Sequence, residues 1–168
     1  MRSSYFDVRL ERPDDAEIID HILSKAFGPD RLTKSSYRLR EGSKEVENLS
    51  FVAELDGRMV GTIKFWPIVV GGKKEALLLG PLAVLPLMQG FGVGLLLIEH
   101  SVEAARQAGH DLVILVGDEP YYARAGFKRV EGKVLMPGPF DPERLLCREL
   151  APGAADGLDG LILPPHRT

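Results

Sequence analysis

The feature that most constrains this chain is an apolar strand that runs into a glycine-rich turn and then a long helix. Residues 75–85 are almost wholly apolar, which predicts a strand buried on both faces. Three alternate glycines follow, and the pattern after them predicts a helix over residues 91–107. A second buried strand is predicted over residues 111–116. A strand, a helix and a strand in this order predict one parallel crossover within a sheet.

Antiparallel strands and shorter helices are predicted around this unit. Residues 51–55 and 59–65 flank Asp56-Gly57, a dipeptide that favours a type I′ hairpin turn. The other predicted elements are a strand over 5–10, a helix from residues 12–15 to Phe27 that ends at Gly28-Pro29, a less regular helix with loops over 30–48, a helix over 119–125, and strands over 127–136 and 145–150. The predicted fold class is mixed α/β, with a single central, mostly antiparallel sheet flanked by helices.

Length and composition fit one domain with one core. The chain has 168 residues, of which 45% are hydrophobic and 27% charged. No repeat and no linker divides it. We therefore expect one domain over residues 1–150, and we expect residues 151–168, rich in Gly, Ala, Pro and Asp, to pack on that domain as a tail or to fray.

Charge and cysteine content narrow the function classes. A net charge of −3 does not suit a protein that grips nucleic-acid backbone, so no nucleic acid is expected as a partner. Cys147 is the single cysteine, and its place in a predicted strand indicates a packing residue in an intracellular protein. The N-terminus has no apolar signal-peptide core, and no apolar stretch approaches the ~20 residues that span a bilayer. A cytoplasmic protein without membrane contact is expected.

The glycine turn predicts an anion site. Glycine permits positive φ and removes the Cβ, so that the backbone can close around an anion at the positive end of a helix. A dinucleotide site requires a third glycine where Leu95 stands, and a P-loop requires a lysine that this turn lacks. The residues alone thus favour an anion site and disfavour both of these nucleotide sites.

Two motifs resemble those of the GNAT superfamily of N-acetyltransferases. The pattern Gln89-x-x-Gly92-x-Gly94 after Leu82-Ala83-Val84-Leu85-Pro86 resembles the family's acetyl-CoA-binding signature. The segment Tyr122-Ala123-Arg124-Ala125-Gly126-Phe127 resembles its tyrosine helix and the Gly-Phe entry into the next strand. The segments around these motifs look like a bacterial branch of predicted acetyltransferases, and the order of elements resembles the family over about residues 5–150.

The resemblance implies an acyl-CoA N-acyltransferase fold in which strands 4 and 5 splay apart and admit the pantetheine arm of acetyl-CoA. It implies backbone contacts to pantetheine from Leu82, Ala83 and Val84. The residues implied for the pyrophosphate are Gln89, Gly90, Phe91, Gly92, Val93, Gly94 and Leu95, with Phe91 and Val93 contributing mainly backbone groups. No metal is expected.

The reaction implied is direct attack of a primary amine on the thioester. Tyr122 is the implied catalytic acid for the leaving thiolate, and its neighbour Tyr121 is expected in the core or in the substrate wall. No general base is assigned, because the middle of the fourth strand has no carboxylate. Glu54 and Glu75 are candidates for the base, although each is better interpreted as a solvated charge at a strand end, and a water relay is an equal candidate for accepting the proton of the amine. Trp66 is expected at a strand end.

The four histidines, His21, His100, His110 and His166, lack metal-ligand spacing and are expected at the surface. The acceptor, a small molecule or a protein amine, stays open, as do the acyl length and the quaternary state, with a homodimer among the alternatives. A non-catalytic acyl-CoA sensor is the main alternative function. A toxin-like acetyltransferase that acts on charged tRNA is disfavoured by the acidic balance.

Overall fold

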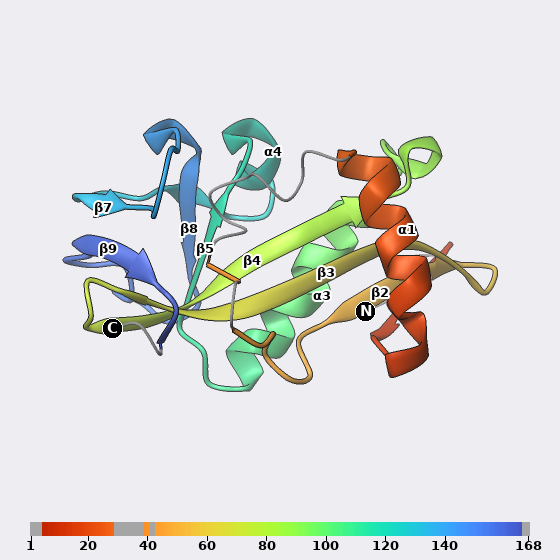
Figure 1. Ribbon diagram of the computed structural model, residues 1–168, viewed down its shortest axis with the longest axis horizontal. Helices are drawn as coiled ribbons and strands as arrows, with labels where there is room; N and C mark the ends of the chain where they lie inside the picture. Colours follow the sequence, from red (N-terminus) through yellow and green to blue (C-terminus); the bar gives the residue numbers. More distant parts are fainter. Residues whose placement is uncertain (1–4, 29–38, 41–42, 166–168) are drawn as a thin grey trace.

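A computed structural model describes residues 5–28, 39–40 and 43–165, which form one central sheet covered on both faces (Figure 1). The strand order is β1-β2-β3-β4-β5-β8-β6, with β9 beside β3 and β7 beside β9. The strands are β1 (Phe6–Leu10), β2 (Phe51–Leu55), β3 (Arg58–Val70), β4 (Lys74–Val84), β5 (Leu112–Val116), β6 (Lys128–Arg129), β7 (Val134–Leu135), β8 (Leu145–Glu149) and β9 (Gly160–Leu163). The α-helices are α1 (Ala16–Phe27), α3 (Val93–Gln107) and α4 (Glu119–Ala123).

The predicted fold class is confirmed. β4 pairs in parallel with β5 through the crossover helix α3, whereas β4 pairs with β3, and β5 with β8, in antiparallel fashion. The predicted hairpin is also confirmed, since Asp56 and Gly57 both have positive φ, at 50° and 79°. That backbone geometry is the one a type I′ turn requires.

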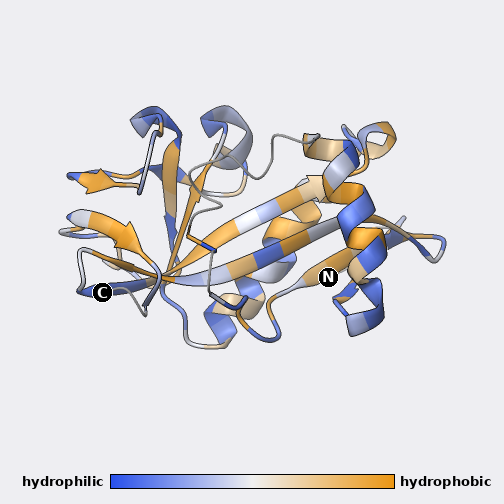
Figure 2. Ribbon diagram, viewed as in Figure 1, coloured by the Kyte–Doolittle hydropathy of each residue, from blue (hydrophilic) through white to orange (hydrophobic). Residues whose placement is uncertain are grey.

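Helices α1 and α3 lie on opposite faces of the sheet (Figure 1). The apolar stripe of α3 includes Leu97 and Ile98, and it packs on Phe65 and Leu77 in the largest core cluster. Strands β5 and β8 are apolar over most of their length, as Figure 2 shows, because helices or loops cover them on both faces. Each large side chain that is fully buried in this way contributes about 1.5–3 kcal/mol to stability.

Strand β3 is longer than predicted, and Trp66 lies within it rather than at its end. β3 continues through Pro67 to Val70 because β2 has already left its edge: the last β3 residue paired with β2 is Ile63. Proline lacks an N–H and is accommodated where a strand edge has no partner strand. The prediction that Trp66 lies at a strand end is therefore wrong, because Pro67 does not end β3.

The last predicted strands also differ from the structure. Residues 127–136 form two short strands, β6 and β7, because Gly132 turns the chain with φ 95°. β9 lies inside the expected tail and pairs with the end of β3. The irregular helix predicted over residues 30–48 lies largely outside the described residues, and residues 39–40 and 43–48 contain no helix.

A β-bulge interrupts β4 at Gly80-Pro81. The register passes from Phe65↔Leu79 to Ile63↔Leu82, so β4 carries one residue more than β3 over this stretch. The indole Nε1 of Trp66 donates to the Gly80 carbonyl oxygen at 2.7 Å, which gives the bulged backbone a hydrogen-bond partner. The bulge sits where β4 begins to separate from β5.

Candidate active site

Strands β4 and β5 pair over only a short stretch and then separate. The register contains Leu77↔Val113 and Leu78↔Ile114 and nothing further, although β4 continues to Val84. The splay implied by the family resemblance is thus present, at the carboxyl ends of a parallel pair, which is a common place for ligands in α/β proteins.

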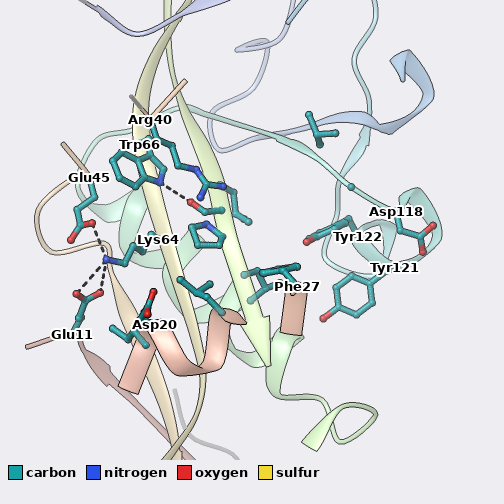
Figure 3. Close-up of a pocket in the computed structure, with 18 of the residues that line it drawn as sticks. Glu11, Asp20, Phe27, Arg40, Glu45, Lys64, Trp66, Asp118, Tyr121 and Tyr122 are labelled. Carbon is teal, nitrogen blue, oxygen red and sulfur yellow. Dashed lines mark hydrogen bonds and ion pairs between the residues drawn. The ribbon is translucent and has the colours of Figure 1, made fainter. Parts of the chain in front are cut away.

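A cavity of about 960 Å³ opens at this splay (Figure 3). The helix α1, the bulge of β4, and the segment from the end of β5 into α4 form its walls. Its lining residues include Glu11, Asp20, Phe27, Arg40, Glu45, Lys64, Trp66, Leu82, Gly117, Asp118, Tyr121, Tyr122 and Arg144. These residues come from segments far apart in the sequence, and many of them are polar or aromatic.

The backbone of β4 beyond the bulge presents polar groups to the opening. Leu85 N donates to Val60 O at 2.9 Å, so Leu85 faces β3. Because successive residues of a strand direct their N–H and C=O groups to alternate sides, Ala83 also faces β3, whereas Leu82 and Val84 face the opening. Of the three residues implied for pantetheine, Leu82 and Val84 therefore direct their backbone groups toward the splay, whereas the backbone groups of Ala83 face β3.

The glycine turn forms a second hollow, of about 300 Å³, that adjoins the cavity through Leu82, Tyr121 and Tyr122. Eight of the ten residues predicted to bind acetyl-CoA line it: Leu82, Val84, Gln89, Gly90, Gly92, Val93, Gly94 and Leu95. Phe91, with its side chain 65% exposed, and Ala83 do not. The hollow therefore brings the two predicted backbone segments together.

The N-terminus of α3 supplies unused amide groups to this hollow. Gly92 is the N-cap in the left-handed conformation, with φ 86°. The first hydrogen bond of the helix runs from Leu96 N to Gly92 O at 3.0 Å, so the amides of residues 93–95 precede it. Gln89 Nε2 donates to Val84 O at 3.3 Å and ties the turn to the end of β4. Such a helix end attracts anions.

Arg124, in the C-cap of α4, also lines the second hollow. It forms no ion pair with any carboxylate in the described part of the chain. Its guanidinium adds a positive charge beside the helix end. Arg124 is not among the predicted site residues, although it lies inside the tyrosine motif.

Tyr122 points its hydroxyl toward the cavity (Figure 3). Its ring packs against Gly117, where any Cβ would collide with it, and makes an edge contact with Phe127 at 5.9 Å between centroids. Burial raises the pKa of Tyr122 well above its usual value, so the hydroxyl is protonated at neutral pH. A neutral phenol facing a cavity can donate a hydrogen bond or a proton.

Tyr121 lies at the junction of the two hollows and lines both. Its hydroxyl lies against Gly94, where there is no room for a Cβ. Its ring stands at 90° to that of Tyr122, with 5.0 Å between centroids. Glycine at position 94 therefore serves this close packing as well as the turn.

Four carboxylates line the cavity: Asp118 at the start of α4, and Glu11, Asp20 and Glu45 on the other side, none of which is among the predicted site residues. Lys64 Nζ lies 2.9 Å from Glu45 and 3.3 Å from Glu11 (Figure 3). Burial raises the pKa of Glu11. Glu54 pairs instead with Arg9 at 3.3 Å, and neither it nor Glu75 lines the cavity. Because Glu11, Asp20 and Glu45 come from separate segments, only the fold brings them together.

The remaining candidates lie outside the site. Cys147 is buried in β8, and burial raises its pKa, as for a packing residue. His100 is half-buried rather than at the surface, because its ring packs edge-on against Phe51 at 4.7 Å, and burial lowers its pKa. Among the residues described, no group of three or more His, Cys, Asp or Glu side chains could hold a metal ion, and no helix is both long and apolar enough to cross a membrane.

Comparison with known proteins identifies relatives over most of this chain. The protein named uncharacterized N-acetyltransferase YjhQ of Escherichia coli is 32% identical over 143 residues, which are 83% of this chain and 79% of the relative. The protein named uncharacterized N-acetyltransferase YhbS of Escherichia coli is 30% identical over 158 residues, 92% of this chain and 93% of the relative.

Two solved structures share the architecture. The crystal structure of Escherichia coli YhbS in complex with CoA has a TM-score of 0.79 and 27% identity, and it covers 98% of this chain and 92% of that one. A GNAT family acetyltransferase from Brucella melitensis in complex with acetyl-CoA has a TM-score of 0.71 and 32% identity, with 96% of each chain covered. The family model of the GNAT acetyltransferases matches residues 16–127, which contain α1, the splayed strands, the glycine turn and the tyrosine helix. This chain belongs to the GNAT acetyltransferase family.

Proposed function

We propose that this protein transfers the acetyl group of acetyl-CoA to a primary amine by direct attack of the amine on the thioester. One observation carries the proposal: the opening between β4 and β5 brings together the β4 backbone edge that has no partner strand, the first-turn amides of α3 and the Tyr122 hydroxyl. The complexes of YhbS with CoA and of the Brucella protein with acetyl-CoA support the choice of cosubstrate.

The residues present fit the parts of coenzyme A. The outward N–H and C=O groups of Leu82 and the outward N–H of Val84 can pair with the amide groups of pantetheine as a strand pairs with its neighbour. The amides of residues 93–95 and the Arg124 guanidinium suit the diphosphate, because both favour negative charge. Acetyl-CoA supplies the thioester, and the chain supplies the groups that hold and polarise it.

In this proposal the amine nitrogen forms a bond to the carbonyl carbon, and the carbon–sulfur bond then breaks. The Val84 N–H faces the splay and is placed to stabilise the oxyanion, a kind of donor that contributes about 2.7–4 kcal/mol in other enzymes. Tyr122 protonates the departing thiolate. Because its pKa is raised, proton transfer is expected to accompany cleavage of the carbon–sulfur bond rather than precede it.

The proton lost by the amine requires an acceptor. Glu54 and Glu75 do not reach the cavity, so we assign them no part in this step. The cavity carboxylates Glu11, Asp20 and Glu45 favour an enzyme over a sensor, since a protein that only binds acyl-CoA does not need an acceptor cavity with proton-accepting groups. We propose that water carries this proton toward Glu11, a cavity carboxyl whose pKa burial raises.

Thermal unfolding with acetyl-CoA tests the binding step first. A ligand at 100 times its Kd adds about 2.7 kcal/mol of stability, and no shift in Tm would remove the proposal. Release of free thiol against a panel of amines then tests the chemistry. Tyr122→Phe is expected to bind acetyl-CoA normally and to turn over slowly, and Tyr5→Phe, outside the cavity, serves as the matched control.

A further inference from the structure

Arg144 lines the cavity together with Tyr122. It ends the short helical turn Pro142–Arg144 that leads into β8. Its backbone O accepts from Gly117 N at 2.9 Å, and its side-chain Nε donates to Gly117 O at 3.3 Å. These two bonds fix the residue at the end of β5. The two terminal nitrogens of the guanidinium are left available to the cavity that Arg144 lines.

The carboxylates around Arg144 are directed elsewhere. Arg129 Nε lies 2.9 Å from Glu119, and Arg129 Nη1 lies 3.7 Å from Glu143. Asp141 accepts from the Glu143 backbone N at 2.9 Å. Asp118 lies on the far side of Tyr122 from its hydroxyl (Figure 3). Within the described part of the chain, no carboxylate pairs with Arg144.

The other cations that line the cavity differ from Arg144 in what they contact. On the opposite wall, two carboxylates neutralise Lys64. Arg40 lies over the Trp66 ring, 5.8 Å from its centroid. Arg144 lines the cavity together with Tyr122, and its positive charge acts on the Tyr122 hydroxyl by opposing the effect of burial on its pKa. A positive charge there opposes the approach of a simple cationic amine, whereas an acceptor with its own anion gains a partner.

We propose that Arg144 binds a carboxylate of the acceptor, so that the acceptor is a small amine that carries a carboxylate near the reacting nitrogen, as a free amino acid does. Planar guanidinium groups bind carboxylates with two parallel hydrogen bonds, which suits this recognition. A lysine side chain within a protein presents no such carboxylate next to its amine. The inference rests on the proposed acetyl transfer and chooses between the two acceptor classes.

Matched sets of amines test the inference. The panel contains the twenty standard amino acids, their primary amides and the corresponding amines without a carboxyl group, each assayed for thiol release from acetyl-CoA. At least one free amino acid is expected to exceed its own amide about 10-fold or more in kcat/KM. If acetyl-CoA binds and no free amino acid is acetylated, or the amides react as well, the inference is overturned and the acetyl-CoA site stands. If acetyl-CoA does not bind, the proposed function itself falls.

Variants of Arg144 distinguish binding of the acceptor carboxylate from a purely structural role of this residue. Arg144→Gln is expected to lower kcat/KM for the free amino acid about 10- to 100-fold, mainly through KM, and to leave the amide unchanged. Arg144→Lys keeps the positive charge but loses the paired N–H donors of the guanidinium. Its kcat/KM for the free amino acid is expected to lie between those of wild type and Arg144→Gln. Arg106→Gln, on the exposed face of α3, is the matched control. Equal losses for the acid and the amide would indicate a purely structural role and would overturn the inference.

Discussion

The two halves of β4 have similar apolar composition and opposite environments. The first half, at Leu77 and Leu78, pairs with β3 on one edge and with β5 on the other, and it is buried. The second half, from Leu82 to Val84, pairs with β3 alone and faces the splay. Backbone N–H and C=O groups require partners, so the closed half satisfies them within the protein and the open half offers them to a ligand.

This difference teaches that a binding site can be made by omitting strand pairing in the middle of a sheet. An unpaired edge at the outside of a sheet invites association with other chains. The open half of β4 lies instead between two strands of the same sheet and beneath α1, where Leu82 forms part of the wall of the cavity. The following predictions address the two halves separately.

The largest effect on stability is expected in the closed half. Ile114→Ala in β5 removes a fully buried side chain opposite Leu78 and is expected to lower the free energy of unfolding by about 2–5 kcal/mol. Chemical denaturation measures this change. The Kd of acetyl-CoA, measured at a temperature where the variant is folded, is expected to stay within about 2-fold of wild type. A large loss of affinity would show that the two halves are not independent.

The next effect is catalytic and belongs to the open half. Tyr122→Phe is expected to lower kcat about 10²- to 10³-fold, because the leaving thiolate loses its proton donor. Stability and the Kd of acetyl-CoA are expected to change little, since the ring still packs on Gly117 and Phe127. Steady-state kinetics and calorimetry measure the two quantities. An unchanged kcat in an active enzyme would remove Tyr122 from the mechanism.

A smaller effect is expected at the glycine turn. Gly92→Val puts a β-branched residue at φ 86° and is expected to weaken acetyl-CoA binding about 10- to 100-fold, because the first-turn amides move. Gly157→Val is a matched control, since Gly157 also has positive φ and open space around it but lies far along the chain in another turn. Comparable losses of affinity in both variants would indicate a general loss of folding instead.

The smallest effect is a pH dependence. An acid must be protonated to act, and burial raises the pKa of Tyr122 above its usual value of 10.0. The loss of its proton is therefore expected only at pH values above 10, and kcat is expected to show no falling limb from this group between pH 8 and 10. Single-turnover rates across that range measure it. A fall in rate with a midpoint below 10, absent in Tyr122→Phe, would contradict the direction of the shift.

The elements with a strong local pattern could be predicted from the sequence. The Asp56-Gly57 hairpin, the buried strand β4 and the crossover helix α3 each depend on residues close together in the chain. The two motifs around Gly92 and Tyr122 predicted the family, and residues of both motifs line the second hollow. These features are local, so one sequence contains the information that determines them.

Features that depend on distant partners could not be predicted in this way. β3 extends past Pro67 because β2 no longer pairs with its edge there. β9 forms because it pairs with the end of β3, at Val69 and Val70. Glu11, Asp20, Glu45 and Arg144 meet in the cavity only after four separate segments have packed. Periodicity and propensity describe neighbours along the chain, and these contacts join residues far apart in it.

The extra residue of the bulge at Gly80-Pro81 reverses which residues of β4, odd-numbered or even-numbered, face a given side of the sheet. Before it, the odd-numbered Leu77 and Leu79 face the α3 side of the sheet; after it, the even-numbered Leu82 and Val84 do so. An indel of one residue between Leu79 and Leu82 would therefore exchange the two faces and would turn the Ala83 amide, instead of its neighbours, toward the splay. Lineages of this protein should accordingly keep the length of this short segment fixed while its side chains vary.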